Sequence, residues 1–121
     1  MSKEINMFIL KRKIRLNETD ATGAIYFTNL LKFATEAFEE FLNGEVYSIP
    51  IVSAKGSYLA PLFWNDEIEV KLSLAKIGNS SFELHSEVKK GEIVACRTEI
   101  VHVFTSGPIP LELRGRLDQL R

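Results

Sequence analysis

Cysteine, net charge and long apolar runs are all scarce in this sequence. Cys96 is the only cysteine, which excludes an intramolecular disulfide and a thiolate metal cluster and suits a reducing compartment. The formal net charge is −1, so no broad field attracts nucleic acid or an anionic membrane surface. No apolar run approaches the roughly 20 residues that span a bilayer, and Met1 to Asn6 lack the pattern of a secretory signal. We therefore expect a cytoplasmic protein without nucleic-acid or membrane partners.

Length and composition fit one folded domain. The chain has 121 residues, of which 45% are apolar and 26% charged, and these values are typical of a globular protein. We expect a single domain over residues 1–121.

Alternating apolar and polar residues predict five strands. In the first, the apolar residues Phe8, Leu10, Ile14 and Leu16 recur at period two, with Lys11, Lys13 and Arg15 on the other face. Four later runs of extended or alternating sequence are bounded by Gly, Pro or Asn and cover Ile51 to Leu59, Glu67 to Ile77, Phe82 to Val88, and Ile93 to about Phe104.

One long helix is predicted from Ile25 to Leu42, because its apolar residues share a broad helical face and Asn43-Gly44 supplies a stop. A short terminal helix is predicted between Pro110 and Leu120. A stripe this wide requires a sheet that curls around it, which is the hotdog architecture: an α+β fold with an antiparallel five-stranded sheet wrapped around one helix. The helix covers one sheet face only and edge strands need partners, so we expect a homo-oligomer, at least a dimer.

The loop between the first strand and the helix carries the chemistry. Asp20 precedes the predicted helix start, where free backbone N–H groups and the helix dipole stabilise an anion. Gly23 permits a tight bend and a close approach of the backbone to a ligand. A purely structural interpretation stays open, in which Thr19 or Asp20 caps the helix and Gly23 only turns the chain.

These segments resemble the 4-hydroxybenzoyl-CoA thioesterase family of hotdog proteins. The signature is an acidic residue followed by an apolar-aromatic helix start, here Thr19-Asp20-Ala21-Thr22-Gly23-Ala24-Ile25-Tyr26-Phe27. The likeness continues along most of the chain, through Glu36 to Leu42, Tyr58-Leu59-Ala60-Pro61 with Asp66, and Gly107 to Pro110.

The resemblance implies an acyl-CoA thioesterase in which Asp20 is the catalytic carboxylate, acting as nucleophile or as general base. It implies no cofactor, and a backbone N–H at about Phe27 that binds the thioester oxygen. A histidine often stands at the position of Phe27 in the short-chain branch, so Tyr26 and Phe27 are more similar to the aryl-CoA branch, including 1,4-dihydroxy-2-naphthoyl-CoA thioesterases. Phe27 packing into the core is the equal alternative. The family also suggests a homotetramer.

Other residues are weighed against ordinary structural roles. Glu36 is an alternative catalyst, because another hotdog group uses a helical glutamate, although a solvated helix face explains it better. We expect His102 and Cys96 to be core residues and His85 to be exposed, with no metal-ligand spacing around it. Trp64 fits either an acyl pocket or an interface.

Rival functions remain. A hotdog hydratase or dehydratase needs a histidine near the helix start, which this loop lacks. The others are a thioesterase for short-chain acyl-CoA or acyl-carrier protein, and a non-catalytic acyl-CoA-binding module. The acidic loop favours catalysis.

Overall fold

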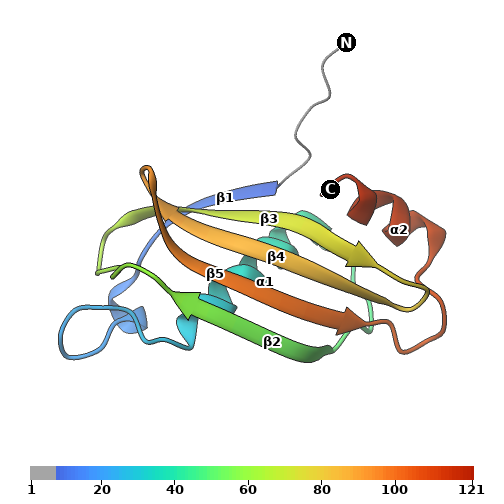
Figure 1. Cartoon of the computed structure of the whole chain (residues 1–121), viewed down its shortest axis with the longest axis horizontal. Helices are drawn as coiled ribbons and strands as arrows, with labels where there is room; N and C mark the ends of the chain where they lie inside the picture. Colours follow the sequence, from blue (N-terminus) through green and yellow to red (C-terminus); the bar gives the residue numbers. More distant parts are fainter. Residues whose placement is uncertain (1–7) are drawn as a thin grey trace, which may run out of the picture.

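A computed structural model describes residues 8–121 as an antiparallel sheet with one long helix behind it (Figure 1). The N-terminal residues Met1 to Asn6, considered above for a signal, lie outside this range. The elements in chain order are β1 (Phe8–Lys13), a 3-10 turn η1 (Leu16–Glu18), α1 (Asn29–Leu42), β2 (Ile51–Tyr58), β3 (Glu67–Ile77), β4 (Ser81–Lys90), β5 (Ile93–Val103) and α2 (Leu111–Asp118).

The five strands follow the spatial order β1-β3-β4-β5-β2. Hairpins join β3 to β4 and β4 to β5, as the turn signals predicted. The chain crosses from β2, at one edge of the sheet, to β3, next to the other edge, so β2 pairs with β5 rather than with its neighbour in sequence. Both β1 and β2 are edge strands, and β2 is exposed over most of its length.

The core lies between α1 and the inner face of the sheet. Leu30, Phe33 and Ala37 of α1 are buried against strand residues such as Val70 and Leu72. Each fully buried Leu or Phe side chain contributes about 1.5–3 kcal/mol relative to exposure, so this layer is the main source of stability.

The terminal helix α2 closes one end of this core. Leu113, Leu117 and Leu120 are buried there, and Arg116 donates to the carbonyl oxygens of Phe41 and Leu42. Arg116 thereby satisfies two of the free carbonyl groups at the C-terminus of α1.

Two predicted boundaries are wrong. The long helix begins at Asn29 rather than Ile25, because Ile25 forms an extended bridge with Thr19 and its N–H donates to Leu62 O at 2.9 Å. Leu16 lies in η1 and is 61% exposed, because the first strand ends at Lys13.

The predicted helix stop is confirmed. Asn43 and Gly44 adopt left-handed conformations with φ of 53° and 89°, and the Asn43 N–H donates to carbonyl groups of the last helical turn. Within residues 8–121, no helix is both long and apolar enough to cross a membrane.

Candidate active site

The loop of residues 19–25 is held at both sides by the rest of the chain. Thr19 bridges Ile25, and Ala24 bridges Phe63. The N–H of Trp64 donates to Gly23 O at 3.1 Å, so the segment that leads into β3 supports the loop from outside. Gly23 has a φ of +85°, a conformation that favours glycine, which confirms the predicted tight bend.

Asp20 lies in this loop, and only one of its two carboxylate oxygens accepts hydrogen bonds from residues 8–121. Its Oδ1 accepts hydrogen bonds from the N–H of Thr22 at 2.8 Å and from Thr22 Oγ1 at 2.5 Å. No group within residues 8–121 donates to Oδ2. The Thr22 hydroxyl and N–H lower the pKa of Asp20, because both bonds favour the charged carboxylate. Asp20 is therefore an anion at neutral pH.

The start of α1 offers two free backbone N–H groups next to the loop. The N–H of Tyr26 is already used, because it donates to Glu18 O at 3.1 Å. The amides of Phe27 and Thr28 have no acceptor in the described part of the chain, and Asn29 is the first residue of the helix. Free N–H groups at the positive end of a helix dipole are suited to bind a developing oxyanion.

Aromatic side chains stand exposed around this loop. Tyr26 is 52% and Phe27 58% exposed, so the alternative in which Phe27 packs into the core is wrong. Phe63 and Trp64, on the segment that supports the loop, are also exposed. Flat apolar surfaces of this kind can stack on a planar ligand or pack against another subunit.

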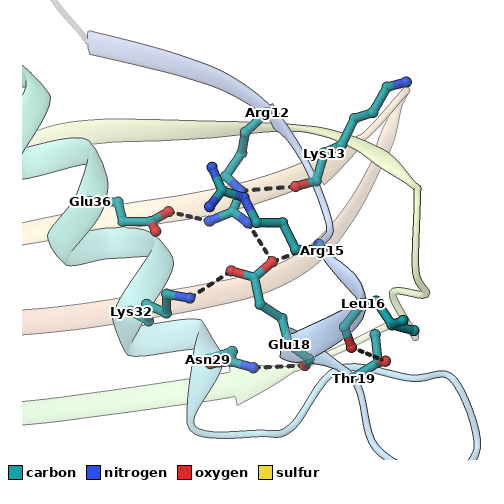
Figure 2. A network of polar contacts seen from close by, with 9 residues as sticks. All are labelled: Arg12, Lys13, Arg15, Leu16, Glu18, Thr19, Asn29, Lys32 and Glu36. Atoms are coloured by element: carbon teal, nitrogen blue, oxygen red, sulfur yellow. Dashed lines mark hydrogen bonds and ion pairs between the residues drawn. The ribbon is translucent and has the colours of Figure 1, made fainter.

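Glu18, which the sequence did not single out, is the buried centre of a charge network beside the loop (Figure 2). Its carboxylate accepts from Arg12 and, at 2.8 Å, from Lys32 Nζ. Its backbone oxygen accepts from Asn29 Nδ2 at 2.7 Å. Glu18 therefore connects β1, the loop and the start of α1.

The charges in this network stabilise one another. Burial by itself raises the pKa of Glu18, but hydrogen bonds from Arg12, Lys32 and the N–H of Arg15 outweigh it and lower the pKa to about 2. Arg12 also donates to Glu36, which is therefore paired rather than free for catalysis. One signal in the sequence could have revealed this network. Arg12 lies two residues from both Leu10 and Ile14, so it belongs to the same inward face of the strand as these apolar residues, where a charged side chain needs a partner.

The remaining candidates take structural positions. Cys96 is fully buried, and burial raises its thiol pKa to about 12, which confirms a core residue. His102 is buried, as predicted. His85 is half-buried and its Nε2 lies 2.7 Å from Glu83 Oε2. Ligand atoms of Glu83, His85 and Glu99 lie within 4.8 Å of one another, so these side chains could meet a cation, which their spacing in sequence did not indicate.

A groove of about 600 Å³ lies at the other end of β2 from the loop. It runs between the second half of α1 and the segment 44–51, with Phe38, Leu42, Tyr47 and His102 among its walls. Figure 1 places the loop near the end of β2 and the segment 43–50 near its beginning.

A family model and the sequence relatives of this chain both point to thioester hydrolases. A family model described as the thioesterase-like superfamily matches residues 14–108. A 1,4-dihydroxy-2-naphthoyl-CoA hydrolase of Nostoc punctiforme is 34% identical over 107 aligned positions, covering 79% of this chain and 72% of the relative. One from Acaryochloris marina is 33% identical over 122 positions, covering 84% and 89%.

Solved structures agree with the sequence relatives. A hypothetical protein from Aquifex aeolicus superposes with a TM-score of 0.83 at 27% identity, over 94% of this chain and 99% of the other. A 1,4-dihydroxy-2-naphthoyl-CoA thioesterase from Synechocystis gives a TM-score of 0.85 at 23% identity, over 94% and 97%. The second likeness concerns the fold alone.

Proposed function

Because this chain belongs to the thioesterase-like superfamily, we propose that it hydrolyses an aryl-CoA thioester to the free acid and CoA, with Asp20 as the catalytic carboxylate. The fold is the predicted hotdog and the enzyme class is thioester hydrolase. One observation carries the assignment of Asp20. An ionised carboxylate lies on the loop that leads to the helix start, and within residues 8–121 one of its oxygens and two helix-start amides have no hydrogen-bond partner.

Hydrolysis follows from these groups. Asp20 Oδ2 either attacks the thioester carbon, giving a mixed anhydride that water then cleaves, or takes a proton from water as the hydroxide adds to that carbon. In both routes the carbonyl oxygen becomes an oxyanion, the C–S bond breaks, and CoA leaves as a thiolate that is then protonated. The N–H of Phe27 stabilises the oxyanion, and one such donor is worth about 3–4 kcal/mol.

The preference for an aryl acyl group is supported by two facts. Sequence relatives that cover most of this chain are named as hydrolases of 1,4-dihydroxy-2-naphthoyl-CoA. The exposed rings of Tyr26 and Phe27 next to the loop offer flat walls to a planar group. A short-chain acyl-CoA, or an acyl group on acyl-carrier protein, is the alternative substrate.

We place the active site between two copies of the chain. In one chain, the Asp20 loop and the groove beside segment 44–51 lie at opposite ends of β2. This 8-residue strand spans roughly 25 Å at about 3.3 Å per residue. Two-fold antiparallel pairing of the exposed β2 edges sets the Ile51 end of one copy beside the Tyr58 end of the other. The groove of one protomer then adjoins the loop of its partner, so we propose a homodimer, or a homotetramer built from two such dimers.

The cellular setting forms part of the same proposal. A lone cysteine that is fully buried fits a reducing compartment, so we propose a cytoplasmic enzyme formed by one hotdog domain.

The test is Asp20→Asn, assayed by free-thiol release from benzoyl- and hydroxynaphthoyl-CoA. The change is nearly isosteric and removes the charge, so we expect turnover to fall by about two to four orders of magnitude with the fold intact. Asp118→Asn, an exposed carboxylate on α2 that pairs only with Arg121 among the described residues, is the matched control and should be silent. Near wild-type turnover in a folded Asp20→Asn protein would refute the assignment.

A further inference from the structure

We propose that Asn29 is a positioning residue of the active site, whose side-chain amide fixes the backbone N–H groups of Phe27 and Thr28 relative to Asp20. The inference rests on the proposed function and deepens it, because it adds a residue that sets the geometry between the carboxylate and the oxyanion donors.

One carbonyl oxygen, that of Glu18, holds both ends of the segment that carries these donors. It accepts from the N–H of Tyr26 at 3.1 Å and from Asn29 Nδ2 at 2.7 Å. Because a carbonyl oxygen only accepts, the Asn29 atom that faces it is the amide nitrogen. The N–H of Asn29 also donates to Tyr26 O at 3.0 Å, which closes a tight turn. Phe27 and Thr28 are the inner residues of this turn, so their amides are held from both sides.

The same carbonyl group belongs to the loop that carries the catalytic carboxylate. Glu18 precedes Asp20 by two residues, and the N–H of Asp20 donates to Ala24 O at 2.8 Å, which fixes the backbone of Asp20 in turn. Asp20 and the two amides therefore share Glu18 O as their point of attachment. When the Asn29 bond is lost, the Tyr26 N–H is the one group of the turn that still bonds to this oxygen, and the amides can move relative to the carboxylate.

Glu18 is suited to this task because its own position is fixed. The residue is 1% exposed, and its carboxylate accepts from Arg12 on β1 and, at 2.8 Å, from Lys32 Nζ on α1. Figure 2 shows that Asn29 and Lys32 both extend from α1 towards Glu18, one to its backbone oxygen and the other to its carboxylate. Helix α1 is thus joined to Glu18 at two points, and the Lys32 contact remains when the Asn29 contact is removed.

The Asn29 hydrogen bond matters more for geometry than for stability. Its loss leaves no buried acceptor unsatisfied, because Glu18 O keeps the N–H of Tyr26, and the net contribution of one hydrogen bond to folding is small. An oxyanion donor, in contrast, must meet the developing charge closely. A misplacement of about 1 Å can lower the rate about a hundredfold.

The test is Asn29→Ala, with Asn79→Ala as the matched control. Asn79 is exposed, and its side chain makes no hydrogen bond within residues 8–121. kcat and KM are measured by free-thiol release from benzoyl-CoA. We expect Asn29→Ala to lower kcat about ten- to a hundredfold with KM nearly unchanged, because the donors bind the oxyanion more strongly than the bound substrate. Asn79→Ala should be silent, and Asn29→Gln, which keeps the amide on a longer stem, should recover part of the loss.

Two further measurements separate positioning from a structural role. A non-hydrolysable phenacyl-CoA thioether is titrated into each protein by calorimetry, and the midpoint of urea unfolding is recorded. Positioning predicts that Asn29→Ala binds the thioether with wild-type stoichiometry and unfolds at nearly the wild-type midpoint. A loss of turnover that parallels a lower stoichiometry or an earlier midpoint would refute the role of Asn29, because misfolded sites neither bind nor react.

The outcomes also separate this inference from the proposed function. If wild type hydrolyses no aryl thioester, both fail. If wild type is active and Asp20→Asn is not, but Asn29→Ala reacts at the wild-type rate, the function stands and the role of Asn29 is refuted.

A measurement on the unmodified protein covers the case in which Asn29→Ala does not fold. Hydrogen exchange of the side-chain amides is followed by ¹⁵N NMR, and the Asn29 Nδ2 proton that donates to Glu18 O should exchange several-fold more slowly than those of Asn79. Addition of the thioether should shift the backbone N–H signals of Phe27 and Thr28 and leave Asn29 Nδ2 nearly unchanged. Exchange as fast as that of Asn79, or an equal shift of Asn29 Nδ2, would overturn the proposal.

Discussion

Replacing Glu18 by Gln should destabilise the protein more than any other change of a single carboxylate to its amide. The side chain is 1% exposed and joins the cations of Arg12 and Lys32. Gln keeps the size but turns one oxygen into an N–H donor that faces another donor, and it leaves both cations without their shared anion. Removing one partner of a buried ion pair costs about 3–5 kcal/mol.

The pKa of Glu18 gives an independent magnitude. It falls from its ordinary value of 4.5 to about 2 in the folded protein. At about 1.4 kcal/mol per pKa unit, ionisation of Glu18 contributes about 3 kcal/mol to the free energy of unfolding at pH 7. Because the folded pKa is the lower one, this contribution is fully present above pH 4.5 and disappears as the pH falls towards 2. About half of it is lost by pH 3.

Urea denaturation of wild type and Glu18→Gln at pH 7 and pH 3 tests both values. We expect a difference in unfolding free energy of about 3 kcal/mol at pH 7 that shrinks by about half at pH 3. Glu87→Gln is the matched control, because Glu87 pairs with the exposed Arg97 and should cost less than about 1 kcal/mol. A Glu18→Gln effect below about 1 kcal/mol, or one of equal size at both pH values, would refute the reasoning.

Three further outcomes are expected. In wild type, kcat/KM should be at least about tenfold higher for benzoyl-CoA than for acetyl-CoA, and Phe27→Ala should reduce this ratio. Equal kcat/KM values for the two substrates in wild type would refute the aryl assignment. Cys96 should resist iodoacetamide at pH 8 and react on unfolding, because its thiol is buried with a pKa of about 12, and rapid alkylation of the folded protein would contradict this. Light scattering should give at least a dimer mass at micromolar concentration, whereas a monomer mass would argue against a site shared between subunits.

Local patterns predicted most of the elements because their signals lie within a few residues. The alternation of apolar and polar residues predicted both ends of β3, Glu67 and Ile77, correctly. It predicted the end of β5 to within one residue. The left-handed stop at Asn43-Gly44 needs no distant partner. Burial of His102 followed from its alternation with Val94, Cys96 and Ile100 along β5.

The start of the long helix could not be found in this way. The apolar pattern of α1 extends back through Ile25, Tyr26 and Phe27. However, the N–H of Ile25 donates to Leu62 O and the N–H of Tyr26 donates to Glu18 O. These acceptors belong to other segments, and a hydrogen bond to a partner outside the helix competes with helix formation. The loop therefore stays extended through Ile25, and the rings of Tyr26 and Phe27 are exposed.

By itself, the sequence determined the α+β class, the strands, the end of α1 and the acidic loop, because side-chain periodicity and turn chemistry act over a few residues. The proposed role of Asp20 came from the resemblance of this loop to a known family. The tertiary structure alone decided the crossing of β2 to the far edge, the pairing of Arg12 with Glu18 and Glu36, and the groove over His102. Each of these joins segments far apart in the chain, and such contacts depend on how the apolar faces pack together rather than on any local preference.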